Sequence, residues 1–120
     1  MSDTETKSPQ FLLIFRDSVD SPDISPEEMQ AEFAKWFAWS EKLQAVNKYA
    51  GGNPLEEPGR VLRGDRGQSV TDGPFIEAKE VLCGYFLVNA ADIEEASKIA
   101  EECPGLVRGM SVEIRPVMVP

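Results

Sequence analysis

The densest group of chemically usable side chains in this 120-residue sequence lies at residues 71–80, Thr-Asp-Gly-Pro-Phe-Ile-Glu-Ala-Lys-Glu. Asp72 stands beside a Gly-Pro turn at an expected strand end, where a carboxylate could act as a general base or bind a cationic group. An aspartate that begins a turn can also accept hydrogen bonds from its own backbone. Asp72 is therefore the candidate catalytic residue, and the turn role is the alternative.

Glu77 and Lys79, in the same stretch, share one face if the segment is extended. A lysine flanked by carboxylates stays protonated, so Lys79 is a poor nucleophile but could hold an oxyanion electrostatically. The alternative is a solvated polar connection between strands. We treat both residues as candidate ligand-binding residues.

Phe75, Trp36 and Arg16 are the other candidates for ligand binding. Phe75 could stack on a ligand, or it could cover the core or a dimer interface. Trp36 precedes Trp39 by three residues on an expected helix, so both could line an aromatic pocket, or one could be buried and the other half-exposed. Arg16 ends an apolar strand and could anchor an anionic ligand or pair with Asp72. A rim ion pair of little energetic value is the alternative for Arg16.

The chain contains no histidine. The commonest general base, the histidine-activated nucleophiles and the commonest metal ligand are therefore excluded. Cys83 and Cys103 lack the CxxC spacing of zinc and redox sites, and they are expected to be small buried residues rather than a disulfide. We predict neither a metal nor a cofactor, and any catalysis must use carboxylates, Lys, Tyr, Arg or backbone groups.

The charge balance also limits the partners. A net charge of −9 and a pI of about 4.5 argue against nucleic acid and anionic membranes, because phosphate binding needs clustered Lys and Arg. The first ten residues lack the basic and apolar regions of a signal peptide, so the protein is expected to be cytoplasmic. We predict a flexible N-terminal segment at residues 1–10 and a single domain at residues 11–120.

Two apolar runs indicate central strands. Residues 11–15 and 81–88 are too short for helices and rich in aliphatic and aromatic residues, and the first reads as a strand covered on both faces. Residues 110–116 alternate apolar and polar side chains, which is typical of a half-buried strand. Residues 60–63 and 68–71 flank a polar loop bounded by glycines, which predicts a hairpin. Residues 51–54 read as a turn after a short extended piece at 49–50.

Two helices are predicted. Ser25, Pro26 and Glu28 form a capping box at the start of a helix over 26–46, and Asn47 suits the left-handed residue after its end. Asp92 caps the second helix, which ends at Pro104-Gly105. The buried stripe of the first helix is predicted to contain Met29, Phe33, Trp36, Phe37, Ser40 and Leu43, with Trp39 off its centre.

This order of elements predicts an α+β fold in which one antiparallel sheet carries two helices on one face. In so small a chain, only a second copy is available to cover the other sheet face. We therefore predict a homodimer that packs sheet to sheet.

The chain resembles the DGPF branch of the YCII-related family in T-D-G-P-F-I-E-A-K-E and the following V-L-C-G-Y-F-L-V. The likeness extends through S-P-E-E-M-Q, K-W-F-A-W and G-G-N-P-L to the closing S-V-E-I-R-P-V. It implies a ferredoxin-like fold and a dimeric α+β barrel. The His-Asp pair proposed as catalytic in a shorter branch of the family cannot be carried over, because this chain has no histidine.

Two functions are consistent with these observations. The first is a small-molecule site in a polar cleft of the dimeric barrel, with cofactor-free acid/base chemistry at Asp72. The second is a non-catalytic regulatory or accessory module that binds a protein such as an extracytoplasmic-function sigma factor, since the resemblance implies such a genetic neighbourhood. The sequence leaves open whether the protein is an enzyme.

Overall fold

The structure, a computed structural model, describes residues 9–73 and 79–119 and has an α+β architecture. Its main sheet has four antiparallel strands in the order β2-β5-β1-β6, and a separate two-stranded sheet pairs β3 with β4. The elements are β1 (Gln10–Ser18), α1 (Pro26–Ala45), β2 (Tyr49–Pro54), β3 (Arg60–Arg63), β4 (Ser69–Asp72), β5 (Glu80–Asn89), α2 (Ile93–Ala100) and β6 (Ser111–Pro116), with short 3-10 turns η2 (Asp65–Gly67) and η3 (Leu106–Arg108).

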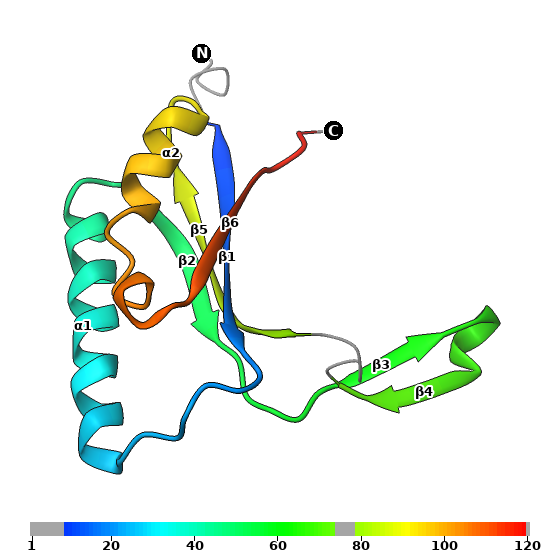
Figure 1. The fold of residues 1–120 in the computed structure, drawn as a ribbon. Helices are drawn as coiled ribbons and strands as arrows, with labels where there is room; N and C mark the ends of the chain where they lie inside the picture. Colours follow the sequence, from blue (N-terminus) through cyan, green and yellow to red (C-terminus); the bar gives the residue numbers. More distant parts are fainter. Residues whose placement is uncertain (1–8, 74–78, 120) are drawn as a thin grey trace.

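Both helices lie on one face of the main sheet, as the sequence predicted (Figure 1). With the β3–β4 hairpin set aside, the order of elements and the strand order are those of a ferredoxin-like fold. Of the predicted flexible segment at residues 1–10, residues 1–8 lie outside the described residues.

The start of α1 is set by a full capping box. The Ser25 side chain accepts a hydrogen bond from the Glu28 backbone N–H, and the Glu28 carboxylate accepts one from the Ser25 backbone N–H. Asn47 follows the helix with a φ of +61°, the left-handed conformation predicted for it. The α1 boundaries are therefore legible in the sequence to within a residue.

The cap of α2 is also confirmed, because the Asp92 carboxylate accepts a hydrogen bond from the Glu95 backbone N–H. The reciprocal bond of a capping box is shifted by one residue: the Glu95 carboxylate accepts from the Ala91 backbone N–H instead. The same carboxylate bonds Lys48, which ties the start of α2 to the segment before β2.

The predicted buried stripe of α1 is wrong at Met29, Phe33 and Phe37 and correct at Ser40 and Leu43. Trp39 and Leu43 are buried, whereas Phe33 and Phe37 are 57% and 64% exposed. Only the C-terminal half of α1 packs directly on the sheet; Met29, Phe33 and Phe37 stand over a cavity and therefore keep much of their surface in water. Periodicity alone cannot distinguish a face that meets a sheet from one that meets a void.

The core lies between the helices and the inner face of the main sheet. Phe11, Leu13 and Phe15 of β1 point towards the helices, next to Phe86 and Val88 of β5, and all five are buried. Alternate residues point to the other face of the sheet.

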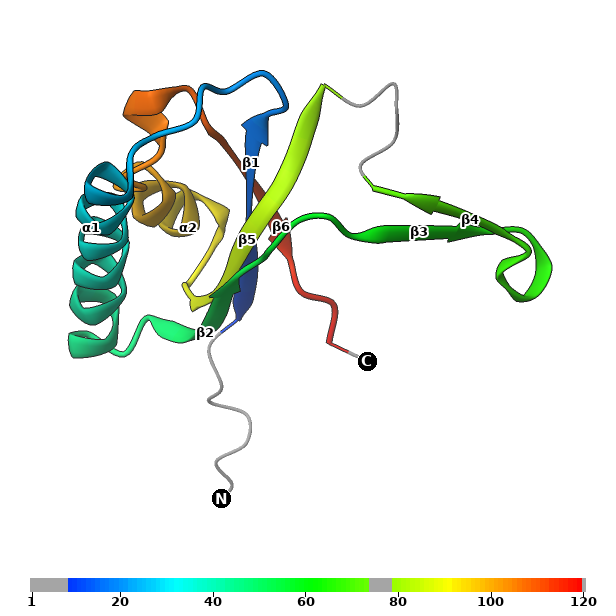
Figure 2. The ribbon, with the colours of Figure 1, turned by 90° about the horizontal axis from the view of Figure 1, so that it is seen from below.

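The opposite sheet face, called the open face below, carries Leu12 and Ile14 of β1 and Leu87 of β5. All three are half-buried, and no helix of the described chain lies over them (Figure 2). The described helices cover only the inner face of β1, so the prediction that both faces are covered is confirmed for that face alone.

Residues 51–54 form most of β2, which corrects the turn predicted for them. Gly51 and Gly52 pair with Leu87 and Phe86 in β5. A Cβ on Gly52 would lie 2.5 Å from the Tyr85 carbonyl oxygen and 2.6 Å from the Phe86 ring, so only glycine allows this close approach. The glycines here serve the pairing of strands rather than chain reversal.

The hairpin β3–β4 is confirmed, with Arg60 paired to Asp72 and Arg63 to Ser69. It projects from the side of the open face, away from both helices, and is called the arm below (Figures 1 and 2). The radius of gyration is 16.6 Å, against about 14 Å for a compact domain of this length. Leu62 and Val70 on the arm are 58% and 52% exposed.

Replacement of Gly52 tests the packing of β2. The variant Gly52→Ala should lose about 1–3 kcal/mol in unfolding free energy, because the added methyl group meets backbone and a buried ring. Urea denaturation followed by circular dichroism measures this loss. Gly59→Ala is the matched control, since a Cβ there meets nothing within 4 Å. Equal stability of the two variants would contradict the close approach.

Candidate functional site

A cavity of about 500 Å³ lies between α1 and the β2 side of the main sheet, and it is called the α1 cavity below. Helix α1 forms one wall, strands β2 and β5 form the other, and segments near residues 17–24 and 108–110 border it. Its lining consists of Phe15, Asp17, Ile24, Met29, Glu32, Phe33, Trp36, Phe37, Ser40, Tyr49, Gly52, Asn53, Pro54, Cys83, Gly84, Tyr85, Phe86, Arg108 and Met110.

The base of the α1 cavity is a cluster of aromatic rings in mutual contact. The Phe15 ring lies 4.8 Å from that of Trp36 and 5.2 Å from that of Phe86, and the Tyr49 ring lies 5.0 Å from that of Phe86, all edge to face. Such pairs add about 0.5–1.5 kcal/mol each beyond the burial of their area. Because these rings also belong to the core or pack against it, the wall is held in place without a ligand.

Two carboxylates and one guanidinium supply the charge of the α1 cavity. The Glu32 carboxylate is 3.2 Å from the Lys35 ammonium and 3.6 Å from the Arg108 guanidinium, and its side chain is 16% exposed. Asp17 accepts hydrogen bonds from the Ser18 backbone N–H at 2.9 Å and the Ser21 hydroxyl at 2.6 Å. The negative groups therefore outnumber the positive one in this lining.

Cys83 lines the cavity as an inert thiol. Its Sγ donates a hydrogen bond to the Phe15 carbonyl oxygen at 3.3 Å. Burial, assisted by the Asp17 carboxylate, raises the pKa of the Cys83 thiol to about 11. Burial also raises the pKa of Cys103. Both cysteines are free, Cys103 buried and Cys83 half-buried, and neither is a ready nucleophile at neutral pH.

Of the sequence-predicted candidates that the structure describes, Trp36 alone lines the α1 cavity. It is half-buried while Trp39 is fully buried, so the predicted division between a core and a partly exposed tryptophan is confirmed. The two rings lie 5.8 Å apart.

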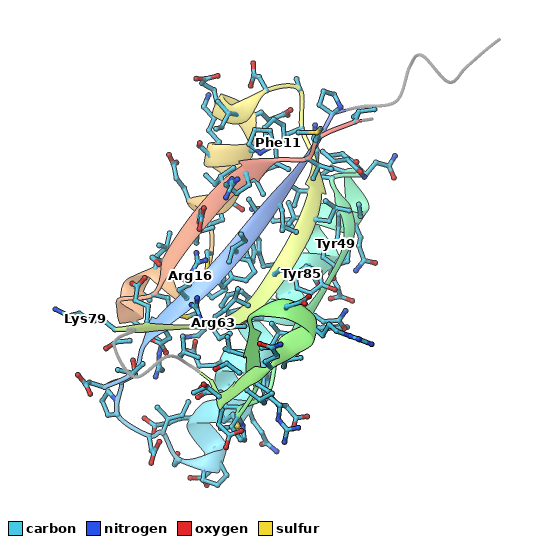
Figure 3. The ribbon with its side chains drawn as sticks, turned by 90° about the vertical axis from the view of Figure 1, so that its right-hand side faces the viewer. Phe11, Arg16, Tyr49, Arg63, Lys79 and Tyr85 are labelled. Atoms are coloured by element: carbon cyan, nitrogen blue, oxygen red, sulfur yellow. The ribbon has the colours of Figure 1, made fainter. Side chains whose placement is uncertain are left out.

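Arg16 lies on the open face and pairs there with Glu113 of β6 (Figure 3). The alternative pairing with Asp72 is not made, because the Asp72 carboxylate is 3.9 Å from Arg60 instead. The hydrogen bond from Arg16 holds the pKa of Glu113 below its ordinary value. Arg16 thus belongs to the open face and does not line the α1 cavity.

Asp72 and Lys79 lie away from the α1 cavity. The Asp72 side chain is 81% exposed at the end of β4, and the neighbouring Gly73 N–H bonds the Gly59 carbonyl rather than the Asp72 carboxylate. Lys79 is exposed just before β5, where its backbone carbonyl accepts a bond from the Val19 N–H at 3.0 Å. Phe75 and Glu77 lie outside the described residues. The roles assigned to these four residues stay predictions.

Sequence reasoning missed most of the α1 cavity. Tyr49 and Asn53 were read as parts of a short extended piece and a turn, and Phe33 and Phe37 as core. One signal was available: the apolar residues of α1, Met29, Phe33, Trp36, Phe37, Trp39 and Leu43, cover more of the helix circumference than one sheet contact requires. An excess of this kind indicates a second apolar environment on the same helix.

Within residues 9–73 and 79–119, no cluster of three or more Asp, Glu or Cys residues has the geometry of a metal site. No helix in the described chain has both the length and the apolarity needed to cross a membrane.

This geometry defines the class of protein: a ferredoxin-like α+β protein with an inserted arm and an aromatic cavity under its long helix. The YCII-related domain family model matches residues 9–119, and the chain belongs to this family. A comparison with curated proteins finds no match. The matched range begins and ends at the first and last residues that the structure describes.

The reactivity of Cys83 follows from its raised pKa. With a pKa of about 11, roughly one thiol in a thousand is ionised at pH 8, so modification by a disulfide reagent such as Ellman's should accelerate about tenfold per pH unit from 7 to 10. The measurement uses Cys103→Ala so that one thiol reports. The same variant unfolded in guanidinium is the control, where the rate should level off above about pH 8.5. A folded-state rate that levels off there too would contradict the raised pKa.

Proposed function

We propose that this protein binds a small, largely apolar molecule in the α1 cavity. The observation that carries the proposal is the cavity itself: its volume of about 500 Å³ lies within the roughly 300–1,000 Å³ of known ligand sites. Its lining is mostly apolar and aromatic, with a few polar groups that could orient a ligand.

Rigidity of the cavity walls supports this proposal. Phe15 and Phe86 are buried core residues of the central strands β1 and β5, and Trp36 is held between them and Trp39. On the β2 side, the Tyr49 ring packs edge to face against the Phe86 ring at 5.0 Å. A preformed wall lowers the ordering cost of binding, because few side chains must be immobilised when the ligand enters.

The proposal includes a homodimer that joins the open faces of two chains. Leu12, Ile14 and Leu87 form a half-buried apolar strip on a sheet face that no described helix covers. The arm projects on that same side and has two exposed apolar residues, Leu62 and Val70. A second copy would bury both features in one symmetric contact.

Acid/base chemistry without a cofactor, with Asp72 as the reacting carboxylate, is the finer part of this proposal. Asp72 lies on the arm and does not line the α1 cavity of its own chain, so it would have to act on a ligand from the arm of a second chain or at another site. Asp72→Asn keeps the shape of the side chain and removes the base. An activity that survives this substitution unchanged would remove Asp72 from the mechanism.

A non-catalytic module that binds a regulatory protein is the second candidate function, and the exposed arm favours it. Leu62 and Val70 would suit a protein contact as well as a second copy of this chain. Co-purification with an extracytoplasmic-function sigma factor that is lost on Leu62→Lys would favour this candidate. Retention of the dimer in the same variant would show that the two contacts are distinct.

Ligand binding in the α1 cavity is tested by a thermal-shift screen of small aromatic compounds. Compounds that raise the melting temperature of the parent protein should lose at least half of that rise in Phe37→Ala, since this residue contributes a wall of the cavity. Leu62→Ala is the matched control, because Leu62 is 58% exposed, close to the 64% of Phe37, but lies on the arm. Equal loss in the two variants would move the binding site elsewhere.

The homodimer is tested by sedimentation equilibrium at micromolar concentration. Leu87→Lys places a charge in the middle of the open face and should convert the dimer to a monomer, because burying an unpaired ammonium costs several kcal/mol. Val107→Lys is the control, since Val107 is 85% exposed on η3, next to α2 and away from the open face. A parent protein that sediments as a monomer would refute the dimer.

A further inference from the structure

We infer that the α1 cavity selects an organic cation, an alkylammonium or protonated amine of modest size, over its neutral and anionic isosteres. The inference rests on the proposed function, because it assigns a ligand class to the same cavity. It is carried by two features of the lining: accessible aromatic rings on α1, and a carboxylate that no cation of the described chain neutralises.

The aromatic rings of α1 provide the first feature. Phe33, Trp36 and Phe37 stand three and four residues apart and therefore lie on one side of the helix. All three line the cavity, and Phe33 and Phe37 keep 57% and 64% of their surface accessible. Aromatic rings attract cations electrostatically through their negative faces, and several rings around one cation make the usual site for quaternary ammonium groups.

The second feature is the state of the two cavity carboxylates. Glu32 is shared between Lys35 and Arg108, so its charge is compensated. Asp17 accepts hydrogen bonds from a backbone N–H and a serine hydroxyl, and it forms no ion pair with any lysine or arginine of the described residues. A ligand cation would therefore supply a counter-charge that no described lysine or arginine gives Asp17.

The field of Asp17 extends into the cavity lining. After burial, the Asp17 carboxylate is the largest influence that raises the pKa of Cys83, which lines the same cavity. A negative potential that disfavours a thiolate at Cys83 favours a positive group in the adjoining space.

An anionic ligand is disfavoured by the pairing of Arg108. Arg108 is the only basic residue among the described lining residues, and its guanidinium lies 3.6 Å from Glu32. An anion would have to displace Glu32 from Arg108 and approach Asp17 uncompensated. The net charge of the chain, −9, also disfavours an anionic ligand at long range.

The test compares three probes of similar size: benzyltrimethylammonium, its neutral carbon isostere neopentylbenzene, and the anion phenylacetate. Binding is followed by tryptophan fluorescence, because Trp36 lines the cavity. Measurements at 150 mM NaCl screen the distant surface charges. We expect the cation to bind at least tenfold more tightly than the neutral isostere and the anion not to bind detectably.

Two variants locate the selectivity. Asp17→Asn keeps an oxygen acceptor for Ser18 and Ser21. It should lower the affinity for the cation about fivefold and leave the affinity for the neutral probe unchanged. Phe33→Leu keeps an apolar side chain but removes a ring. It should lower the affinity for the cation about fivefold more than the affinity for the neutral probe, a difference of about 1 kcal/mol. Glu94→Gln, an exposed carboxylate on α2, is the control and should leave all affinities unchanged.

The possible outcomes separate this inference from the proposed function. If the neutral isostere binds as tightly as the cation, or phenylacetate binds more tightly, the cation selectivity is refuted while the cavity remains a ligand site. If Glu94→Gln weakens the cation as much as Asp17→Asn, the selectivity belongs to the total charge and the inference fails. If none of the three probes binds at millimolar concentration, both this inference and the proposed site fail.

Discussion

The contact between the C-terminal half of α1 and the aromatic residues of β1 and β5 is the interaction on which the rest of this molecule depends. Trp39 is buried, with its ring 5.9 Å from that of Phe15 and 4.9 Å from that of Phe86, and Leu43 is buried one turn further on. These side chains fix the helix to the sheet at one end. The other half of α1 is then free to stand over the α1 cavity, so the core contact and the cavity are two consequences of one helix placement.

The same placement accounts for the chemistry of the cavity. Residues that line it are held either by the core, as Phe15 and Phe86 are, or by polar contacts at its border, as Glu32 and Asp17 are. Two ionisable groups predicted from the sequence, Asp72 and Arg16, instead lie on the arm and the open face. A high density of charged residues in the sequence therefore does not predict a site whose walls come from separate elements.

Local signals predicted most of the fold because their physics is local. The capping box at Ser25, the cap at Asp92 and the hairpin between Arg60 and Asp72 each depend on residues a few positions apart. The two central strands followed from unbroken apolar runs. The predictions from sequence failed where contacts between distant elements determine the structure. Gly51 and Gly52 lie in a strand because β5 pairs with them, and Phe33 is exposed because a cavity lies beneath it.

The candidate site was correspondingly harder to predict than the fold. Trp36 was predicted because an aromatic residue on a helix is a candidate by its type alone. Tyr49, Asn53 and Asp17 line the cavity only because the fold brings other elements beside them. The resemblance to the YCII-related family implied the same fold and did not indicate these positions.

The arm is inserted between β2 and β5, two strands that are hydrogen-bonded neighbours in the main sheet. The chain therefore leaves the sheet at the end of β2 and returns in the neighbouring strand, where Pro54 lies opposite Gly84. The sheet would close in the same way over a shorter or a longer insertion, since doubling a flexible loop costs only about 0.6 kcal/mol. The length and the surface of the arm can thus change while the cavity and the core stay unchanged.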